Sequence, residues 1–233
     1  MDVALVTGAS SGIGLCIAEM LIGMNYTVYG FARDFTKTTF THANFYPRIC
    51  DVMDTHMLVN QTQALLKETD RLDVLINNAG VGFFGPHETI SPEKIERMVK
   101  TNLLAPMVLT QTTLRHLKKS KGFIINMAST AALEPGRFGG AYGATKAGVH
   151  QFSQSLFAEV RKSGVKVVTL YPDMTMTPFY DETDFAPHED PACHITPDCV
   201  ADAVAQAISQ REGTVLTQIV LKPQRVQVER KRI

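Results

Sequence analysis

The chain has 233 residues, and its 23 lysines and arginines balance 23 aspartates and glutamates, so the formal net charge is zero. No strong field therefore favours nucleic acid or an anionic membrane over a small neutral ligand. Hydrophobic residues make up 45% of the chain, but none of their runs approaches the ~20 residues that span a bilayer, which argues against a membrane protein.

The length fits a single compact domain, 1–233. A strand pattern already begins at Val3, which leaves no room for a signal peptide, so we expect a cytoplasmic protein. The four cysteines show no CxxC spacing and are expected to be reduced thiols. A zinc site at Cys193, His194 and Cys199 would match no common ligand spacing.

Short apolar runs alternate with longer helical patterns from one end of the chain to the other. A strand at 3–7, a helix near 13–24 and a strand at 27–32 form a βαβ unit. Further strands are expected at 49–50, 74–76, 123–125, 165–170 and 215–221, with helices near 55–69, 92–118, 142–162 and 197–210. About seven strands predict a doubly wound, Rossmann-type α/β fold with helices on both faces of a parallel sheet and ligand beyond the strands' carboxyl ends.

A glycine-rich turn, TGASSGIG at 7–14, follows the first strand. Glycines let the backbone turn tightly and approach the phosphates of a ligand at the N-terminus of the next helix. The turn therefore predicts pyrophosphate binding, with these candidate contacts: Gly8, Ser10, Ser11, Gly12, Ile13 and Gly14.

The same turn also matches the nucleophile elbow of a serine hydrolase, Gly8-x-Ser10-x-Gly12. An elbow serine needs an oxyanion loop from an earlier strand, and only the first strand precedes residue 8. The hydrolase alternative is therefore disfavoured.

The second strand ends in Ala32, followed by Arg33 and Asp34. An acidic side chain here would bond an adenosine ribose hydroxyl, as in NAD sites, whereas an arginine pairs with the 2′-phosphate of NADP. Arg33 favours NADP(H). Asp34 leaves NAD open, because a small shift in register would bring it to the ribose.

Tyr142 and Lys146 are four residues apart on an expected helix, so both side chains can reach one ligand. A phenol needs a nearby ammonium to favour its ionised form near neutral pH, which Lys146 can supply. Ser129 follows the strand at 123–127 and can hold a carbonyl oxygen as charge develops on it; Thr130 is the local alternative.

Asn102 lies in the helix that begins with Ser91 as N-cap and Pro92 at its first position. Pro106, four residues on, has no N–H to donate to the main-chain carbonyl of Asn102. We therefore expect a kinked helix with this carbonyl free.

These motifs together resemble the short-chain dehydrogenase/reductase family. The glycine turn, Asn77–Gly80, Asn102, Ser129 and Tyr142-x-x-x-Lys146 match its pattern in order over nearly the whole chain. The resemblance implies a catalytic set of Asn102, Ser129, Tyr142 and Lys146, with the main chain of Asn102 holding a relay water.

The resemblance also implies further contacts with the nucleotide. Tyr142 and Lys146 would contact the nicotinamide ribose, and other candidates would contact the adenine, its ribose and the carboxamide: Asp51, Val52, Asn78, Ala79, Gly80, Pro172, Thr175 and Thr177. Asp173 stands where the family has glycine.

The expected reaction is reversible hydride transfer between NADPH and a carbonyl or secondary alcohol substrate, with Tyr142 as proton donor. A non-catalytic NADP(H)-sensing module is the alternative. The segment 174–196 is expected to be a substrate lid, and an apolar pocket is indicated by Phe83, Phe84, Leu133, Phe138, Phe179 and Tyr180. The C-terminal sequence lacks the paired glycines of acyl-carrier-protein reductases in the family. The family also implies homo-oligomers, tetramers or dimers, joined through helices such as 92–118 and 142–162.

Overall fold

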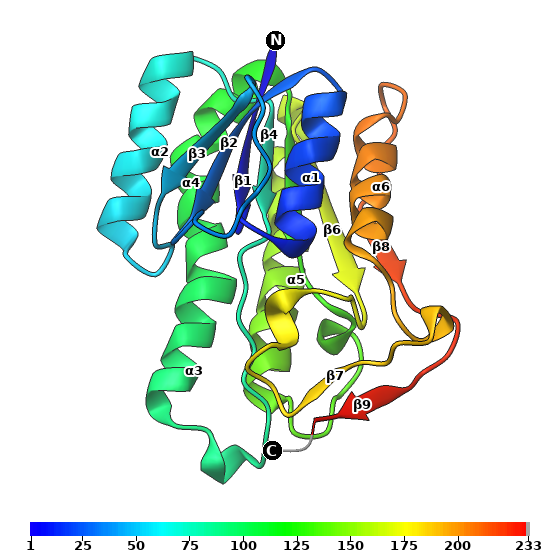
Figure 1. Cartoon of the computed structure of the whole chain (residues 1–233). Coiled ribbons are helices and arrows are strands. Elements are labelled where there is room, and N and C mark those ends of the chain that lie inside the picture. Colours follow the sequence, from blue (N-terminus) through cyan, green and yellow to red (C-terminus); the bar gives the residue numbers. More distant parts are fainter. Residues whose placement is uncertain (232–233) are drawn as a thin grey trace.

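A parallel sheet forms the centre of the protein (Figure 1). The computed structural model describes residues 1–231, so residues 232–233 of the expected domain lie outside the described residues. Within this part of the chain the sheet has seven strands in the order β3-β2-β1-β4-β5-β6-β8, and every neighbouring pair is parallel. The strands are β1 (Asp2–Thr7), β2 (Tyr26–Ala32), β3 (Phe45–Ile49), β4 (Val74–Asn77), β5 (Phe123–Met127), β6 (Lys166–Pro172) and β8 (Gln218–Leu221). The expected doubly wound α/β architecture is confirmed.

Helices cover both faces of this sheet (Figure 1). On one face, α1 (Gly12–Gly23) and α6 (Pro197–Ile208) pack against alternate residues of β1 such as Ala4 and Val6. On the other face, α2 (Thr55–Thr69), α4 (Ala105–Ser120) and α5 (Gly140–Val160) bury the residues between them, Val3 and Leu5. Because successive side chains of a strand point to opposite faces of the sheet, each strand contributes residues to both hydrophobic cores.

The order of the strands reverses between β1 and β4. From β1 the chain builds outward to β2 and β3, and from β4 it builds the other way to β5, β6 and β8. The crevice at the carboxyl ends of β1 and β4 is therefore the topological switch point, where ligands bind in folds of this kind.

Three expected elements differ from the structure. The strand expected at 215–221 is shorter, because β8 begins at Gln218. The strand expected at 49–50 is β3 at Phe45–Ile49, an edge strand that tolerates Pro47 because no further strand needs its N–H. The helix expected at 92–118 is divided into α3 (Pro92–Val99), a π-helical turn (Lys100–Leu104) and α4. The capping prediction for this helix is confirmed: Ser91 accepts a hydrogen bond from the backbone N of Lys94, and Pro92 is at N1.

Beyond the carboxyl ends of the sheet lies a smaller antiparallel pair (Figure 1). It joins β7 (Phe185–Pro187), from the expected lid segment, to β9 (Val228–Arg230), near the end of the chain. The segment expected to form a lid therefore contributes a strand of its own.

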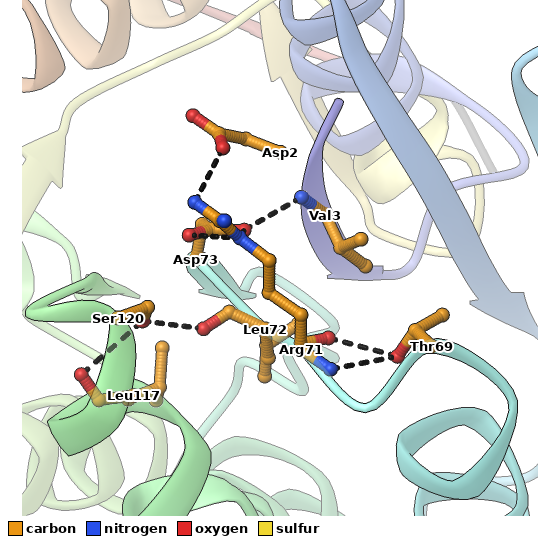
Figure 2. A network of polar contacts seen from close by, with 8 residues as sticks. All are labelled: Asp2, Val3, Thr69, Arg71, Leu72, Asp73, Leu117 and Ser120. Atoms are coloured by element: carbon orange, nitrogen blue, oxygen red, sulfur yellow. Dashed lines mark hydrogen bonds and ion pairs between the residues drawn. The ribbon is translucent and has the colours of Figure 1, made fainter.

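A polar network fastens the opposite, amino end of the sheet (Figure 2). The carboxylate of Asp73 accepts hydrogen bonds from the backbone N of Val3 (2.8 Å) and from Nε of Arg71 (2.7 and 2.9 Å). Arg71 also reaches Asp2, at 2.6 Å. The start of β1 is thereby tied to the residues just before β4.

The cysteines, all within the described residues, are free thiols. Between residues 1 and 231, no helix is both long enough and apolar enough to cross a bilayer.

Candidate active site

The glycine turn after β1 has a backbone that side chains would disturb. Gly8 and Gly12 have φ angles of +67° and +53°, in the left-handed region that favours glycine. A Cβ on Gly14 would lie 2.2 Å from the carbonyl oxygen of Gly8, so α1 packs directly on the turn. In this fully described helix, Ser11 makes no side-chain cap and the first turn has no acidic residue. The first N–H groups of α1 are therefore available to an anion.

Thr7 and Asn78 join the ends of β1 and β4 beside this turn. Nδ2 of Asn78 donates to the carbonyl of Thr7 at 2.9 Å, and the backbone N–H groups of Asn78 and Ala79 both donate to Thr7 Oγ1 at 3.0 Å. A Cβ on Gly8 would lie 2.9 Å from Asn78 Nδ2. The 78–80 segment is thus braced against the glycine turn at the switch point.

The end of β2 carries two charged residues with different surroundings. Asp34 accepts hydrogen bonds from the backbone N and the hydroxyl of Thr36, at 2.7 and 2.8 Å, and these bonds hold its pKa below the ordinary value. Arg33 is exposed, and among the described residues it has no ion pair or side-chain hydrogen bond. Arg33 is therefore available to a ligand, whereas Asp34 is engaged by its own loop.

Asp51 and Val52 lie just after β3, whose neighbour β2 ends at Ala32. Asp51 is half-buried and accepts a hydrogen bond from the backbone N of Met53 at 2.9 Å. Val52 packs against the core of the α2 face. Both residues therefore stand at the same edge of the sheet as Arg33.

Tyr142 and Lys146 are buried together in the first two turns of α5. They are 9% and 4% exposed, and Lys146 Nζ lies 5.7 Å from the centre of the Tyr142 ring. The ammonium donates to the carbonyl of Met127, at the end of β5, at 2.8 Å. The expected pair is therefore brought together, and β5 fixes its lysine.

Burial dominates the titration of both groups. It raises the pKa of Tyr142 to about 12, with the hydrogen-bonding side chain of Ser129 acting in the opposite direction. It lowers the pKa of Lys146 to about 8. The phenol is thus held in its neutral, proton-donating form, and burial outweighs the stabilisation of the phenolate expected from Lys146.

Ser129 follows β5 and begins a short 3₁₀ turn, Thr130–Ala132. Its Oγ accepts a hydrogen bond from the backbone N of Ala131 at 3.2 Å. This bond leaves the hydroxyl proton free to be donated, next to the phenol of Tyr142.

Asn102 is held by both ends of its carboxamide. Its Oδ1 accepts from the backbone N of Val81, and its Nδ2 donates to the carbonyl of Val81, both at 2.9 Å. Nδ2 also reaches Thr145 Oγ1 at 3.1 Å, which in turn donates to the carbonyl of Tyr142. Asn102 therefore ties the segment after β4 to the helix that carries Tyr142. Sequence reasoning missed Val81, whose contact is through the backbone, and Thr145, which has no motif around it.

The π-helical turn places the main chain of Asn102 differently from the expected kink. Ala105 donates its N–H to the carbonyl of Lys100, five residues earlier, and Pro106 has no hydrogen to offer Asn102. A Cβ on Gly80 would lie 3.6 Å from both Asn102 Oδ1 and Lys146 Nζ. Gly80, Asn102 and Lys146 thus meet at one point.

The loop after β6 returns to the glycine turn. Thr175 forms a bridge with Ile195, and its hydroxyl donates to the carbonyl of Asp173 at 2.9 Å. Thr177 Cγ2 lies 3.2 Å from where a Cβ on Gly12 would stand. Asp173 does not have a positive φ, so glycine is not required at this position. Thr177 therefore lies beside the glycine turn, and Pro172 is the last residue of β6.

An aromatic cluster covers Tyr142: Phe84, Phe179, Tyr180 and Phe185. The rings of Phe84 and Phe179 lie 5.2 and 6.0 Å from the Tyr142 ring, and Phe185 lies 5.1 Å from Phe84. Tyr180 packs between Phe179 and Phe185 at 5.1 and 5.6 Å. Phe185 was missed from the sequence, because nothing local showed that the lid folds back onto Phe84.

Of the other expected apolar residues, Phe83 lines a cavity with Gly82 and Phe84. Leu133 and Phe138 are 43% and 47% exposed, and the ring of Phe83 packs under Lys94 and Arg97 on α3. Within residues 1–231, no group of three or more His, Cys, Asp or Glu side chains is placed to hold a metal ion.

The chain is similar to known oxidoreductases over most of its length. A family model described as short chain dehydrogenase matches residues 2–186. An uncharacterized oxidoreductase of Staphylococcus epidermidis is 31% identical over 226 residues, which are 95% of this chain and 96% of that protein.

Solved structures are similar over nearly the same span. An alcohol dehydrogenase from the archaeon Thermococcus sibiricus, complexed with 5-hydroxy-NADP, superposes with a TM-score of 0.87 at 25% identity, covering 96% of this chain and 97% of the other. A metagenomic short-chain oxidoreductase in complex with NADP has a TM-score of 0.80 and 30% identity, with 95% and 97% covered.

Proposed function

Since the chain belongs to the short-chain dehydrogenase family of oxidoreductases, we propose that it uses NADP(H) to interconvert a carbonyl group and a secondary alcohol, with Tyr142 as proton donor. One observation carries the proposal: a neutral phenol and a buried ammonium lie together beside Ser129, at the end of β5 next to the switch point. A carbonyl oxygen at this place would meet two hydroxyl donors.

The residues present fit a dinucleotide. The uncapped start of α1 and the close packing of Gly8 and Gly14 suit a pyrophosphate, held by the turn residues Ser10, Ser11, Gly12 and Ile13. Arg33 would bind the 2′-phosphate, which favours NADP(H), and the two NADP-bound structural relatives support this choice. When bound, NADPH supplies the hydride that the carbonyl carbon receives.

We assign the remaining contacts by position along the carboxyl edge. Asp51 and Val52 would meet the adenine, because they follow β3 next to Arg33. Asn78, Ala79 and Gly80 would line the adjoining ribose beside the turn. Pro172, Thr175 and Thr177 would meet the carboxamide where the loop after β6 returns to Gly12. A ligand bound in this way would extend along the ends of β3, β1, β4 and β6.

Side chains of the protein would bind the carbonyl oxygen of the substrate and supply its proton. Ser129 and Tyr142 bond the carbonyl oxygen, and Tyr142 donates its proton to that oxygen as negative charge develops. With a pKa raised to about 12, the phenol carries this proton throughout the neutral range. Lys146, with a pKa lowered to about 8, can return a proton to the phenolate, and the main-chain carbonyl of Asn102 can hold the water that leads to solvent.

Replacing Tyr142 by phenylalanine tests the assignment. NADPH oxidation should be followed with acetophenone, 2-heptanone and 4-nitrobenzaldehyde, together with the Kd for NADPH from its fluorescence. We expect Y142F to lower turnover about 100-fold or more, because general acid catalysis is lost, while the Kd stays within about twofold. Tyr29→Phe is the matched control, since its hydroxyl bonds Glu68 on α2, away from the site.

Two results would reject this function. Turnover unchanged in Y142F would remove Tyr142 from the chemistry. NADPH binding by a wild-type protein that turns over none of the carbonyl compounds would instead favour the nucleotide-sensing alternative.

A further inference from the structure

The lid and the end of the chain carry opposite charges. The segment 174–196, here called the lid, has five acidic residues and no lysine or arginine: Asp181, Glu182, Asp184, Glu189 and Asp190. The segment 223–231, here called the strap, has three basic residues and one acidic residue: Arg225, Arg230, Lys231 and Glu229. Their charges are therefore complementary before any contact is considered.

The backbone of the strap is hydrogen-bonded to the lid along its length. Its strand β9 pairs antiparallel with β7 of the lid, with Val228 opposite Pro187 and Arg230 opposite Phe185. The N–H of Lys231 donates to the carbonyl of Asp184 at 2.9 Å, and that of Arg225 to the carbonyl of Ala192 at 2.8 Å. Figure 1 shows β9 lying along β7 beyond the carboxyl ends of the sheet.

Two strap side chains add charged contacts. Arg225 forms an ion pair with Asp190 at 3.2 Å. The ammonium of Lys231 donates to the main-chain carbonyls of Tyr180 and Asp181, at the end of the 3₁₀ turn Pro178–Tyr180. A cation at the carboxyl end of a helical turn satisfies carbonyls that have no partner within the turn.

This turn is the part of the lid that lies over the catalytic tyrosine. It carries Phe179, whose ring is 6.0 Å from the Tyr142 ring, and Tyr180, which packs on Phe185. Lys231 also borders a cavity of about 500 Å³ with Gly82, Phe84 and lid residues 181–184. Phe84 packs on Tyr142 as well, so the strap reaches the surroundings of the phenol from two directions.

We propose that the strap holds the lid in place over Tyr142 and that Lys231 is a positioning residue for substrate. The effect on substrate binding rests on the proposed function, whereas the restraint on the lid follows from the strap contacts alone. A substrate that reaches the phenol would lie beside the rings of Phe84 and Phe179. A lid that holds Phe179 in a fixed position would therefore strengthen substrate binding. Lys231 bonds the far end of the 3₁₀ turn, whereas Thr177 and Pro178, at its start, lie beside Gly12 of the glycine turn.

The test compares two full-length variants that lose one positive charge from the strap. Lys231→Met removes the donor to the turn and keeps the aliphatic stem. Arg230→Gln is the matched control, because Arg230 is the residue before Lys231 in the strap and its side chain makes no hydrogen bond or ion pair with any described residue. Hydrogen–deuterium exchange of peptides covering 177–187 reports the lid without any substrate.

We expect K231M to speed exchange in 177–187 about fivefold, as loss of a charge-assisted bond would, with R230Q close to wild type. With the carbonyl compound that wild type reduces best, K231M should raise KM about threefold or more, and by a larger factor than it raises the Kd for NADPH, while kcat changes less than twofold.

Each other result has a definite meaning. An unchanged exchange rate in K231M, or an equal rise of this rate in R230Q, would reject the proposal that Lys231 holds the lid. Faster exchange with unchanged KM overturns the link to substrate. A wild type that reduces none of the carbonyl compounds removes the proposed function, while the exchange measurement still decides the strap.

Discussion

Arg33 and Asp34 are neighbours, but only one of them is free to select a nucleotide. Asp34 is engaged with Thr36, so the small shift that would bring it to a ribose would break two hydrogen bonds. Arg33 has no such partner among residues 1–231. The sequence predicted the contact of Arg33 with the 2′-phosphate but left open whether Asp34 would bind the ribose. The hydrogen bond from the backbone N–H of Thr36 to the Asp34 carboxylate depends on loop geometry that the sequence does not show.

Arg33→Ala should therefore weaken binding of NADPH selectively. A charge-assisted pair with a phosphate contributes enough for about a tenfold rise in Kd when it is lost. The Kd for NADH, which has no 2′-phosphate, should change less than twofold and serves as the internal control. Fluorescence titration of both nucleotides measures the two values. An equal loss for both would show that Arg33 acts on the shared part of the nucleotide or on folding.

Lys146 should make stability depend on pH in a particular direction. Its pKa is lowered from the ordinary lysine value of 10.5 to about 8 in the folded protein, so between these values the unfolded chain binds more protons and stability rises with pH. Wild type should gain about 2 kcal/mol of unfolding free energy relative to Lys146→Met between pH 7 and pH 10. Urea unfolding at both pH values measures this difference.

The control for this titration is Lys118→Met, on the exposed side of α4. It removes one ammonium without a buried site, so its difference from wild type should stay constant between the two pH values. Parallel pH dependences for K146M and wild type would show that the ammonium of Lys146 is hydrated in the folded protein.

At the scale of elements, hydrophobic period and motif order predicted most of the fold. The apolar runs of β1, β4, β5 and β6 are buried between two layers of helices, and such strands are evident in sequence. β3 was less evident because Pro47 interrupts its pattern, and only its edge position permits that proline.

The π-helical turn at Lys100–Leu104 shows where local reasoning ends. Pro106 predicted that the helix could not continue regularly past Asn102. A kink and a π turn both satisfy that condition. The hydrogen bonds of Asn102 to Val81 and Thr145, which belong to other elements, are not evident from the local sequence. The pairing of β7 with β9 escaped prediction for the same reason, since two three-residue strands far apart in the chain carry no periodicity of their own.

At the scale of the whole molecule, the carboxyl end of the sheet carries the candidate site and the amino end carries a structural polar network. The glycine turn, Asn78, Ser129 and the loop after β6 all follow the carboxyl ends of strands. The network of Asp73 in Figure 2 lies at the amino ends, about 16 Å along β1 from Gly8 at the usual rise per residue. Changes at the amino end should therefore alter stability and leave the site intact.

Asp73→Ala should lower the free energy of unfolding by about 2 kcal/mol, because the backbone N–H of Val3 loses its buried acceptor. Arg71→Gln should cost about 0.5 kcal/mol or less, since the Arg71 side chain is 53% exposed and surface ion pairs contribute little. Urea unfolding of both variants, with the Kd for NADPH alongside, separates the two contributions. Equal losses would mean that the ion pair holds this end together, and a weakened Kd in D73A would show that the two ends of the sheet are coupled.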